Sequence, residues 1–187
     1  MNKNLNDYIK IYHNSIDDSI CEQSVLTLNQ QNWMKNTFSG YEKGDDVSLS
    51  ENEPDVCYAN IPTRGMLMFN IHQTLLKYIT DLDFPWFNGW SGYTAIRFNR
   101  YHVGQEMAKH CDHITINDDG MRKGIPILSV IGALNDDYEG GSLIMFDDEE
   151  IRLKKGDIMV FPSSFQYPHR VAPVTKGVRD TFVSWVW

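Results

Sequence analysis

The spacing of apolar residues changes along the chain, and the change predicts two parts of different structure. In residues 64–80, apolar side chains recur three and four positions apart, which is typical of a helix that packs one face against a sheet. An earlier helix is expected to begin with Asp18 or Ser19 as its N-cap and to run towards Trp33. The polar, glycine-containing stretch 39–55 predicts a loop. The apolar face of the second helix would consist of Met68, Ile71, Leu75, Leu76 and Ile79.

From residue 90 onward the pattern changes to short β-rich runs separated by Gly, Pro, Asn and Asp. Many short strands without intervening helices favour an antiparallel sandwich or barrel, and the double-sheet jelly roll is the common fold of this length that encloses a metal. We therefore expect one domain over residues 1–187 in the α+β class, mainly β, with helical support in 1–90 and the jelly roll in 91–187. The expected strands cover 93–98, 127–134, 143–146, 150–153, 157–161, 169–171 and 181–187.

Composition narrows the possible partners and location. The formal net charge is −8, which argues against a general nucleic-acid binder because phosphate contacts need a surplus of Lys and Arg. The longest apolar stretches are far shorter than the roughly 20 residues of a membrane span, and the N-terminus has no signal-peptide core. Three widely separated cysteines, Cys21, Cys57 and Cys111, form no disulfide framework or zinc pattern. We expect a cytoplasmic protein with no membrane association.

His110 and Asp112 are the first candidate metal ligands. In a strand, side chains at i and i+2 point to the same face, so an imidazole and a carboxylate can converge on one ion. With His169 from a later run they would form the facial triad of non-haem Fe(II) oxygenases, which leaves three coordination positions open. The pair alone also fits a surface His beside a surface Asp, and zinc lacks a further suitably spaced ligand. The adjacent His113 would point to the opposite face.

Arg179 follows His169 after a short connection in which Pro173 and Gly177 turn the chain. Such a connection returns the chain close to its starting point, so Arg179 is expected near the level of His169. A guanidinium there could grip a carboxylate through two parallel hydrogen bonds while the other end of a dicarboxylic acid chelates the metal. Two alternatives remain open. Arg179 could form a surface salt bridge with Asp180 or Asp157, and Arg170 could compete for the carboxylate.

Together with their surroundings, these residues resemble the catalytic domain of the prolyl 4-hydroxylase-type 2-oxoglutarate/Fe(II)-dependent dioxygenases. The resemblance covers roughly half of the chain, and its segments occur in the order and spacing that the family shows. The matching positions are Arg100-Tyr101, Gly104-Gln105, His110, Asp112, Leu134-Asn135, Tyr138, Gly140-Gly141, Leu143, Lys155-Gly156-Asp157, Phe161-Pro162, His169, Pro173, Gly177, Arg179 and Trp185.

The resemblance implies a double-stranded β-helix (jelly-roll) core with N-terminal helices packed on one sheet. It implies that Fe(II) is bound by the three candidate ligands, and that Arg179 binds the distal carboxylate of 2-oxoglutarate. It further implies contacts to the same co-substrate from Tyr101 and Ser129, with Leu143 and Trp185 as apolar walls. The chain departs from some relatives at Ala133, where they carry a tyrosine that contacts 2-oxoglutarate, and from many prolyl hydroxylases that use Lys where Arg179 stands.

The implied activity is hydroxylation of an unactivated C–H bond with 2-oxoglutarate and O2 as co-substrates, release of succinate and CO2, and ascorbate as a candidate supporting reductant. A prolyl residue of a peptide or protein is the leading candidate substrate, and a small molecule or a nucleobase is the alternative. A non-catalytic metal-binding jelly roll that serves as a sensor or binding module is the alternative from another class. Residues 39–55 and 113–124 could act as lids. Tyr58, Trp86, Trp90 and Arg97 are candidate substrate contacts, with plain packing as the alternative for each.

Overall fold

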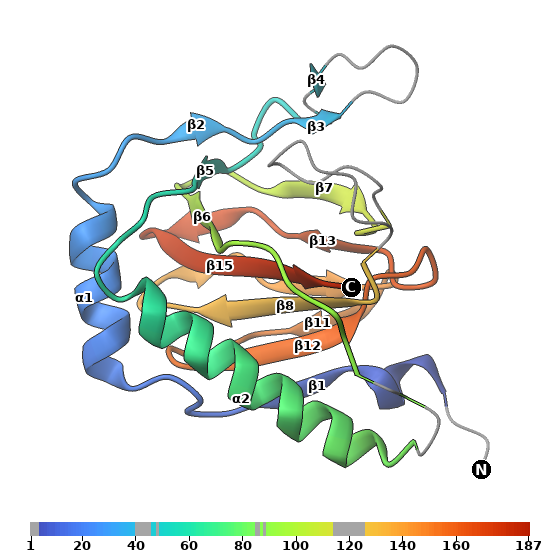
Figure 1. The fold of residues 1–187 in the computed structure, drawn as a ribbon. Coiled ribbons are helices and arrows are strands. Elements are labelled where there is room, and N and C mark those ends of the chain that lie inside the picture. The colour runs from blue at the N-terminus through green and yellow to red at the C-terminus, as the bar shows by residue number, and fades with distance from the viewer. Residues whose placement is uncertain (1–3, 40–45, 48, 85–86, 88, 114–125) are drawn as a thin grey trace.

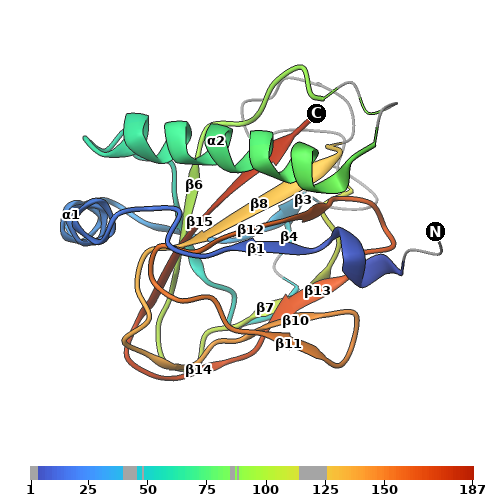
Figure 2. The same cartoon turned by 90° about the horizontal axis from the view of Figure 1, so that it is seen from below.

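Two antiparallel β-sheets face each other in the computed structural model, which describes residues 4–39, 46–47, 49–84, 87, 89–113 and 126–187. A larger and a smaller sheet form the two layers, and the helices lie on the outer side of the larger one (Figures 1 and 2). The larger sheet has the order β1 (Lys10–Tyr12), β12 (Ile158–Pro162), β8 (Leu128–Ala133), β15 (Arg179–Val186), β6 (Arg97–Tyr101), β5 (Asp55–Cys57) and β2 (Met34–Lys35).

The smaller sheet and two short ribbons complete the β-structure among the described residues. The smaller sheet has the order β11 (Glu149–Ile151), β10 (Leu143–Met145), β13 (His169–Val171) and β7 (Met107–His110). The ribbons pair β14 (Val174–Lys176) with β9 (Glu139–Gly140), and β3 (Phe38–Ser39) with β4 (Asp46–Val47).

The chain alternates between the two sheets in its C-terminal half. It passes from β8 to β10, then to β12, β13 and β15, so that alternate strands fall in the larger and the smaller sheet. This alternation confirms the predicted double-stranded β-helix. Tyr101, Met107, Leu143, Phe161 and Val171 belong to one buried cluster, which draws on strands of both sheets. The interior between the sheets is therefore the place where the strands can bring polar side chains together.

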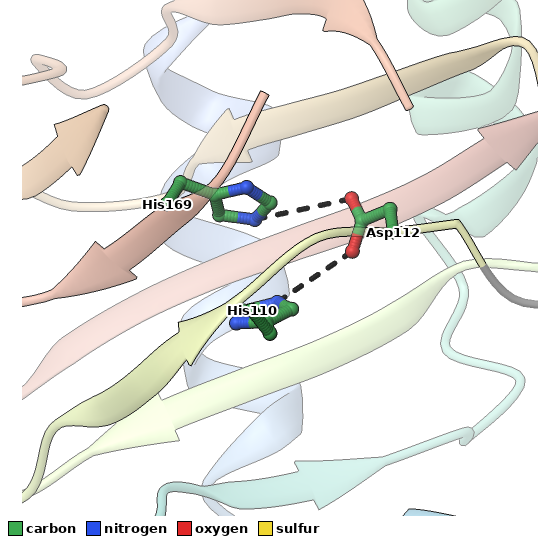
Figure 3. Close-up of side chains that lie close together, drawn as sticks. All are labelled: His110, Asp112 and His169. Carbon is green, nitrogen blue, oxygen red and sulfur yellow. Dashed lines mark ion pairs between the residues drawn. The ribbon is translucent and has the colours of Figure 1, made fainter. Parts of the chain in front are cut away.

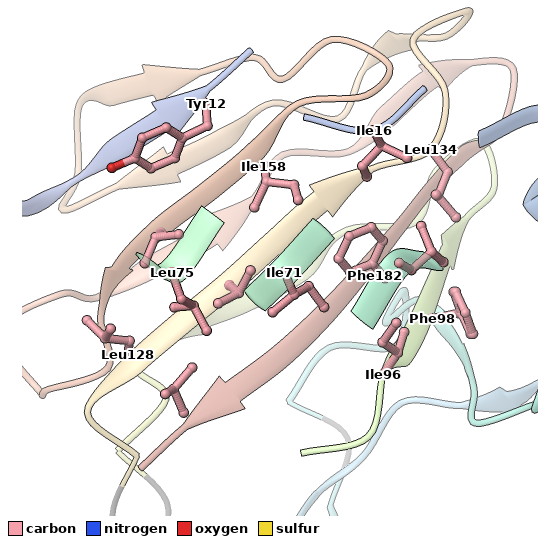
Figure 4. Packing of buried hydrophobic residues seen from close by; sticks show 14 of the residues in the cluster. Tyr12, Ile16, Ile71, Leu75, Ile96, Phe98, Leu128, Leu134, Ile158 and Phe182 are labelled. Atoms are coloured by element: carbon pink, nitrogen blue, oxygen red, sulfur yellow. The ribbon is translucent and has the colours of Figure 1, made fainter. Parts of the chain in front are cut away.

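Helix α2 (Arg64–Leu82) packs on the larger sheet, as its apolar spacing predicts. Ile71 and Leu75 point at the sheet, where they meet side chains of β8, β12 and β15 (Figure 4). Phe182 fits under the helix because Gly132 on the neighbouring strand has no side chain; a Cβ there would lie 2.0 Å from the Phe182 ring. The predicted apolar face of this helix is wrong at one position, since Leu76 is exposed.

Helix α1 (Asp18–Leu28) differs from its expected bounds at both ends. Asp17 is the N-cap, because its carbonyl already accepts from the backbone N–H groups of Ile20 and Cys21. The helix ends at Leu28 instead of continuing towards Trp33, and the Trp33 indole turns back to donate to the Leu28 carbonyl. The N-terminus also contributes a 3-10 helix η1 (Leu5–Tyr8), and strand β1, which the sequence pattern does not predict.

Residues 40–45 and 48 of the stretch predicted as a first lid loop, 39–55, and nearly all of the second, 113–124, lie outside the described residues. Where the first is described, it contains residues of the short strands β3, β4 and β5, and residues 49–52 between β4 and β5 form bends and turns. Within the part of the chain that the structure describes, no helix combines the length and apolar character needed to cross a membrane.

Candidate metal centre and co-substrate pocket

His110, Asp112 and His169 come together between the sheets. His110 is the last residue of β7 and pairs in register with His169, the first residue of β13. Asp112 lies just beyond the end of β7, not within a strand as the i, i+2 argument assumed. Nε2 of His110 is 3.5 Å from Oδ1 of Asp112, and Nε2 of His169 is 3.9 Å from Oδ2 (Figure 3). One potential ligand atom from each residue lies within 4.8 Å of the others, a spacing that one ion can bridge.

Backbone carbonyls fix the orientation of both imidazoles. Nδ1 of His110 lies 2.8 Å from the Ala108 carbonyl, and Nδ1 of His169 lies 3.1 Å from the Tyr167 carbonyl. A carbonyl oxygen can only accept, so Nδ1 donates in each ring and Nε2 is the nitrogen directed at the metal site. Both Nε2 atoms face the Asp112 carboxylate. This is the arrangement in which an outer hydrogen bond orients a histidine for metal binding.

The Asp112 carboxylate is buried and held from one side by serine hydroxyls. Ser129 on β8 donates a 2.6 Å hydrogen bond to Oδ2, and Ser163 lies 2.7 Å from the Ser129 hydroxyl. Burial alone would raise the pKa of Asp112, but His169, His110 and the Ser129 hydrogen bond hold it well below its ordinary value. The carboxylate is therefore ionised and available as an anionic ligand.

Burial, together with the nearby His110, lowers the pKa of His169 to about 4 despite the opposing charge of Asp112. His169 is thus neutral near pH 7, as a metal ligand must be. Two imidazoles and one carboxylate suit a non-haem Fe(II) centre with open positions for further ligands. No fourth side chain joins this set among the residues that the structure describes.

Arg179 lies at the other end of the same interior space. It is the first residue of β15, pairs with Tyr101 on β6, and is only 3 % exposed. Its guanidinium carbon lies 4.7 Å from the centroid of the Tyr101 ring. Nε and Nη1 are buried and have no hydrogen-bond partner among the described residues. A buried charged group left this way costs free energy unless a ligand supplies an acceptor, and a carboxylate matches its two donors.

Neither alternative ion pair of Arg179 forms among the described residues. Arg100 holds Asp180 through two hydrogen bonds of 2.7 Å, and His13 approaches Asp157 at 3.0 Å. Arg170 does not line the cavity that contains the metal ligands and Arg179.

Gly141 makes room for the Arg179 side chain. It has a positive φ of 64°, and a Cβ at this position would lie 2.9 Å from Cδ of Arg179 and 3.0 Å from Val174 Cγ2. Gly141, the second glycine of the Gly140-Gly141 pair noted in the sequence, therefore leaves room for the arginine side chain between β9 and β10.

The remaining predicted site residues divide into two groups. Tyr101, Leu143 and Trp185 line the cavity with the metal ligands and Arg179. Burial raises the pKa of Tyr101, against the opposing effect of Arg179, so its phenol stays protonated and can donate. Ser129 does not line the cavity; it contacts Asp112 instead of a space beside Arg179. Ala133 is buried and offers no polar side chain.

The structure adds Asn99 to the cavity, a residue that the sequence reasoning missed, and places Arg97 there as well. Both alternate with Tyr101 along β6, so all three side chains lie on the face directed between the sheets. The spacing of Arg97, Asn99 and Tyr101, two positions apart in one strand, is the sequence feature that could have predicted that Asn99 lies on the cavity side. His113 lies near Phe165, with ring centroids 6.2 Å apart, and is not part of the ligand set.

Comparison with known proteins agrees with this geometry. Residues 96–187 match the family model described as the 2OG-Fe(II) oxygenase superfamily. A PKHD-type hydroxylase of Idiomarina loihiensis is 38% identical over 94 residues, which cover 49% of this chain and 41% of that protein. A PKHD-type hydroxylase of Stenotrophomonas maltophilia is 38% identical over 100 residues, 50% of this chain and 43% of that protein. The chain thus spans less than half the length of these curated relatives.

Solved structures share the fold over nearly the whole chain. A prolyl hydroxylase from Trichoplax adhaerens, in complex with a hypoxia inducible factor peptide fragment, superposes with a TM-score of 0.71 at 19% identity, over 97% of this chain and 84% of that one. A Pseudomonas putida prolyl-4-hydroxylase gives 0.68 at 15% identity, over 96% and 91%. The family model and the site point the same way: residues 96–187, which match the 2OG-Fe(II) oxygenase superfamily, contain all three residues of the His-Asp-His set.

Proposed function

We propose that this chain is a dioxygenase that uses Fe(II), 2-oxoglutarate and O2 to hydroxylate an unactivated C–H bond. One observation carries the proposal: a buried His-Asp-His set and a buried Arg179 with unpartnered N–H groups line a single cavity. A metal at one end and a carboxylate anchor at the other match a co-substrate that is a dicarboxylic acid with a chelating keto-acid end. A non-catalytic metal-binding jelly roll, the alternative from another class, gives no reason for a carboxylate anchor at Arg179.

Each group of cavity residues has its own proposed role. His110, Asp112 and His169 would hold the iron, and Arg179 with Tyr101 would hold the distal carboxylate of 2-oxoglutarate. Leu143 and Trp185 would exclude water, which strengthens the charge interaction at Arg179. Bound iron with its co-substrates supplies the oxidising power; one oxygen atom of O2 enters the substrate and the other enters succinate, with release of CO2. For Ser129 we propose a positioning role, since its hydroxyl orients Asp112.

A prolyl residue of a peptide or protein is the substrate class that we propose. Prolyl hydroxylases share the fold, and the matched structure from Trichoplax adhaerens holds a peptide fragment. The test is mass spectrometry of proteins from host cells that express either the wild-type chain or Asp112→Ala. The proposal predicts proline residues heavier by one oxygen atom only with the wild type. If the modified residues are not proline, the chemistry stands and the substrate class is wrong.

A further inference from the structure

Three unpartnered polar atoms remain in the cavity after the co-substrate anchor is accounted for. Among the described residues, the buried side-chain N and O atoms without a hydrogen-bond partner belong to Arg97, Asn99, Arg179 and Trp185, and all four residues line this one cavity. A carboxylate at Arg179 would satisfy Nε and Nη1 of that residue. Nε of Arg97, Oδ1 of Asn99 and Nε1 of Trp185 are left over. A buried polar atom that stays unpaired destabilises the structure, so a ligand is expected there.

Arg97 lies at the metal's end of the cavity. Its guanidinium carbon is 4.8 Å from the Trp185 ring centroid. Trp185 pairs in register with Ser129, and the Ser129 hydroxyl holds the Asp112 carboxylate. The chain of contacts from Arg97 therefore leads to the metal ligands.

Arg97 and Arg179 mark different positions along the same pair of strands. On β15, Arg179 pairs with Tyr101, whereas Arg97 pairs with Val183. Four strand residues separate the two levels, which corresponds to about 13 Å. This is a separation of backbone positions, and a distal carboxylate bound at Arg179 would satisfy the free donors of that residue. Arg97 thus requires another explanation than the distal anchor.

The outer side of Arg97 is already supported by protein. Nη1 makes a long contact of 3.5 Å to Oδ1 of Asn36, and Nδ2 of Asn36 donates to the buried Glu53 carboxylate at 2.9 Å. The other oxygen of Glu53 accepts from the Ala108 backbone N–H. This arrangement fixes the guanidinium on the Trp185 ring and leaves Nε without an acceptor among the described residues.

From these contacts we infer that the primary substrate carries a free carboxylate, held beside the metal centre by Arg97 and the Trp185 indole. Nε–H of Arg97 and Nε1–H of Trp185 are two donors for its oxygens, and Oδ1 of Asn99 can accept from a neighbouring N–H. An α-amino acid unit with an unblocked carboxylate supplies this set. Two sources share that chemistry: a free amino acid and the C-terminal residue of a peptide. The inference rests on the proposed chemistry; a chain end would narrow the proposed peptide substrate, and a free amino acid would replace it.

The test measures binding to the wild-type chain loaded with Mn(II) and 2-oxoglutarate, so that no turnover consumes the ligands. The probes are the proteinogenic amino acids in four forms: free acid, amide with a free amine, N-acetylated acid and N-acetylated amide. Binding of a free acid indicates an amino acid substrate, whereas binding of the N-acetylated acid alone indicates a chain end. In either case the matching amide should bind roughly 10- to 100-fold more weakly, since a charge-assisted hydrogen bond is lost.

Arg97→Gln should abolish this preference for the acid, and Arg97→Lys should keep part of it. Arg64→Gln is the matched control, because Arg64 is the first residue of α2, contacts Asn60 and does not line the cavity. Circular dichroism checks that each variant folds. The inference is overturned if no acid binds, if amides bind equally well, or if Arg97→Gln weakens 2-oxoglutarate and not the probe. Uncoupled succinate formation by the wild type distinguishes failure of this inference from failure of the proposed function. Turnover without acid binding contradicts only the inference, whereas absence of turnover contradicts the proposed function.

Discussion

Ser129 donates a 2.6 Å hydrogen bond to Oδ2 of Asp112 and thereby ties a candidate metal ligand to strand β8 of the opposite sheet. Ser129→Ala leaves the carboxylate less firmly oriented. We expect metal affinity to fall by roughly 10- to 100-fold, the usual effect of losing such a partner. Titration with Co(II), followed by its visible absorption, measures this change. Ser163→Ala is the control, because Ser163 contacts Ser129 but the Ser129–Asp112 bond remains. Equal losses in both variants would contradict a specific role for Ser129.

Arg179→Gln tests the co-substrate anchor. Removing a buried charged partner costs about 2–5 kcal/mol, so the Kd for 2-oxoglutarate should rise roughly 30- to 5,000-fold. Calorimetry on the Mn(II)-loaded protein gives this Kd directly, and metal affinity itself should change little. An unchanged Kd would contradict Arg179 as the anchor of the distal carboxylate.

Gly141→Ala tests whether the room beside Arg179 matters. The new methyl group would meet Cδ of Arg179 at 2.9 Å and displace the guanidinium, so we expect weaker 2-oxoglutarate binding. Gly104→Ala is a close control, since Gly104 also has a positive φ, 85°, but a Cβ there would meet no described atom within 4 Å. Both variants strain the backbone, and only Gly141→Ala should lose co-substrate affinity. Similar 2-oxoglutarate affinities in the two would argue against the displacement.

The Arg100–Asp180 pair is expected to support folding and not binding. Both residues are buried, their two hydrogen bonds are 2.7 Å long, and the guanidinium lies over the Trp33 ring at 4.6 Å. Arg100→Met would leave the Asp180 charge buried without its partner and lower the free energy of unfolding by about 3–5 kcal/mol. Urea denaturation measures the loss. Lys176→Met breaks the exposed pair with Glu139 and should change stability little; a comparable loss there would undermine the distinction.

The three cysteines should differ in reactivity. Cys21 and Cys57 are buried, and burial raises the pKa of Cys21 to about 11, whereas Cys111 between the two ligands is partly exposed. Native protein treated with iodoacetamide near pH 8, where about a quarter of an ordinary thiol is ionised, should be alkylated first at Cys111. Peptide mapping identifies the site. Early labelling of Cys21 would show that the α1 packing opens readily.

Much of the fold and of the candidate site could be predicted from the sequence, because period and spacing report local geometry well. Apolar residues recur at helical spacing in α2 because one face of the helix is buried. The β-rich runs keep the order of the strands because each run has a buried face. His110, Asp112 and His169 were predicted as one set, although Asp112 proves to lie beyond its strand. Spacing alone could not show this, since a residue just past a strand end can still direct its side chain at the same space.

Tertiary contacts explain the features that could not be predicted. Strand β1 is short and forms because β12 offers it an edge. The contact between Ser129 and Asp112 joins residues of different sheets, and no local pattern records it. The half-buried position of Arg97 depends on Trp185 and Asn36, which are distant along the chain.

One cavity is proposed to join an iron site to a 2-oxoglutarate anchor, and formation of succinate from 2-oxoglutarate tests this proposal most directly. Purified wild type, Asp112→Ala and Arg179→Gln are compared with Fe(II), ascorbate and O2. We predict turnover by the wild type, loss with Asp112→Ala, and recovery of part of the rate with Arg179→Gln at high 2-oxoglutarate. Absence of turnover in the wild type, with 2-oxoglutarate binding unaffected by Asp112→Ala, would contradict the proposal.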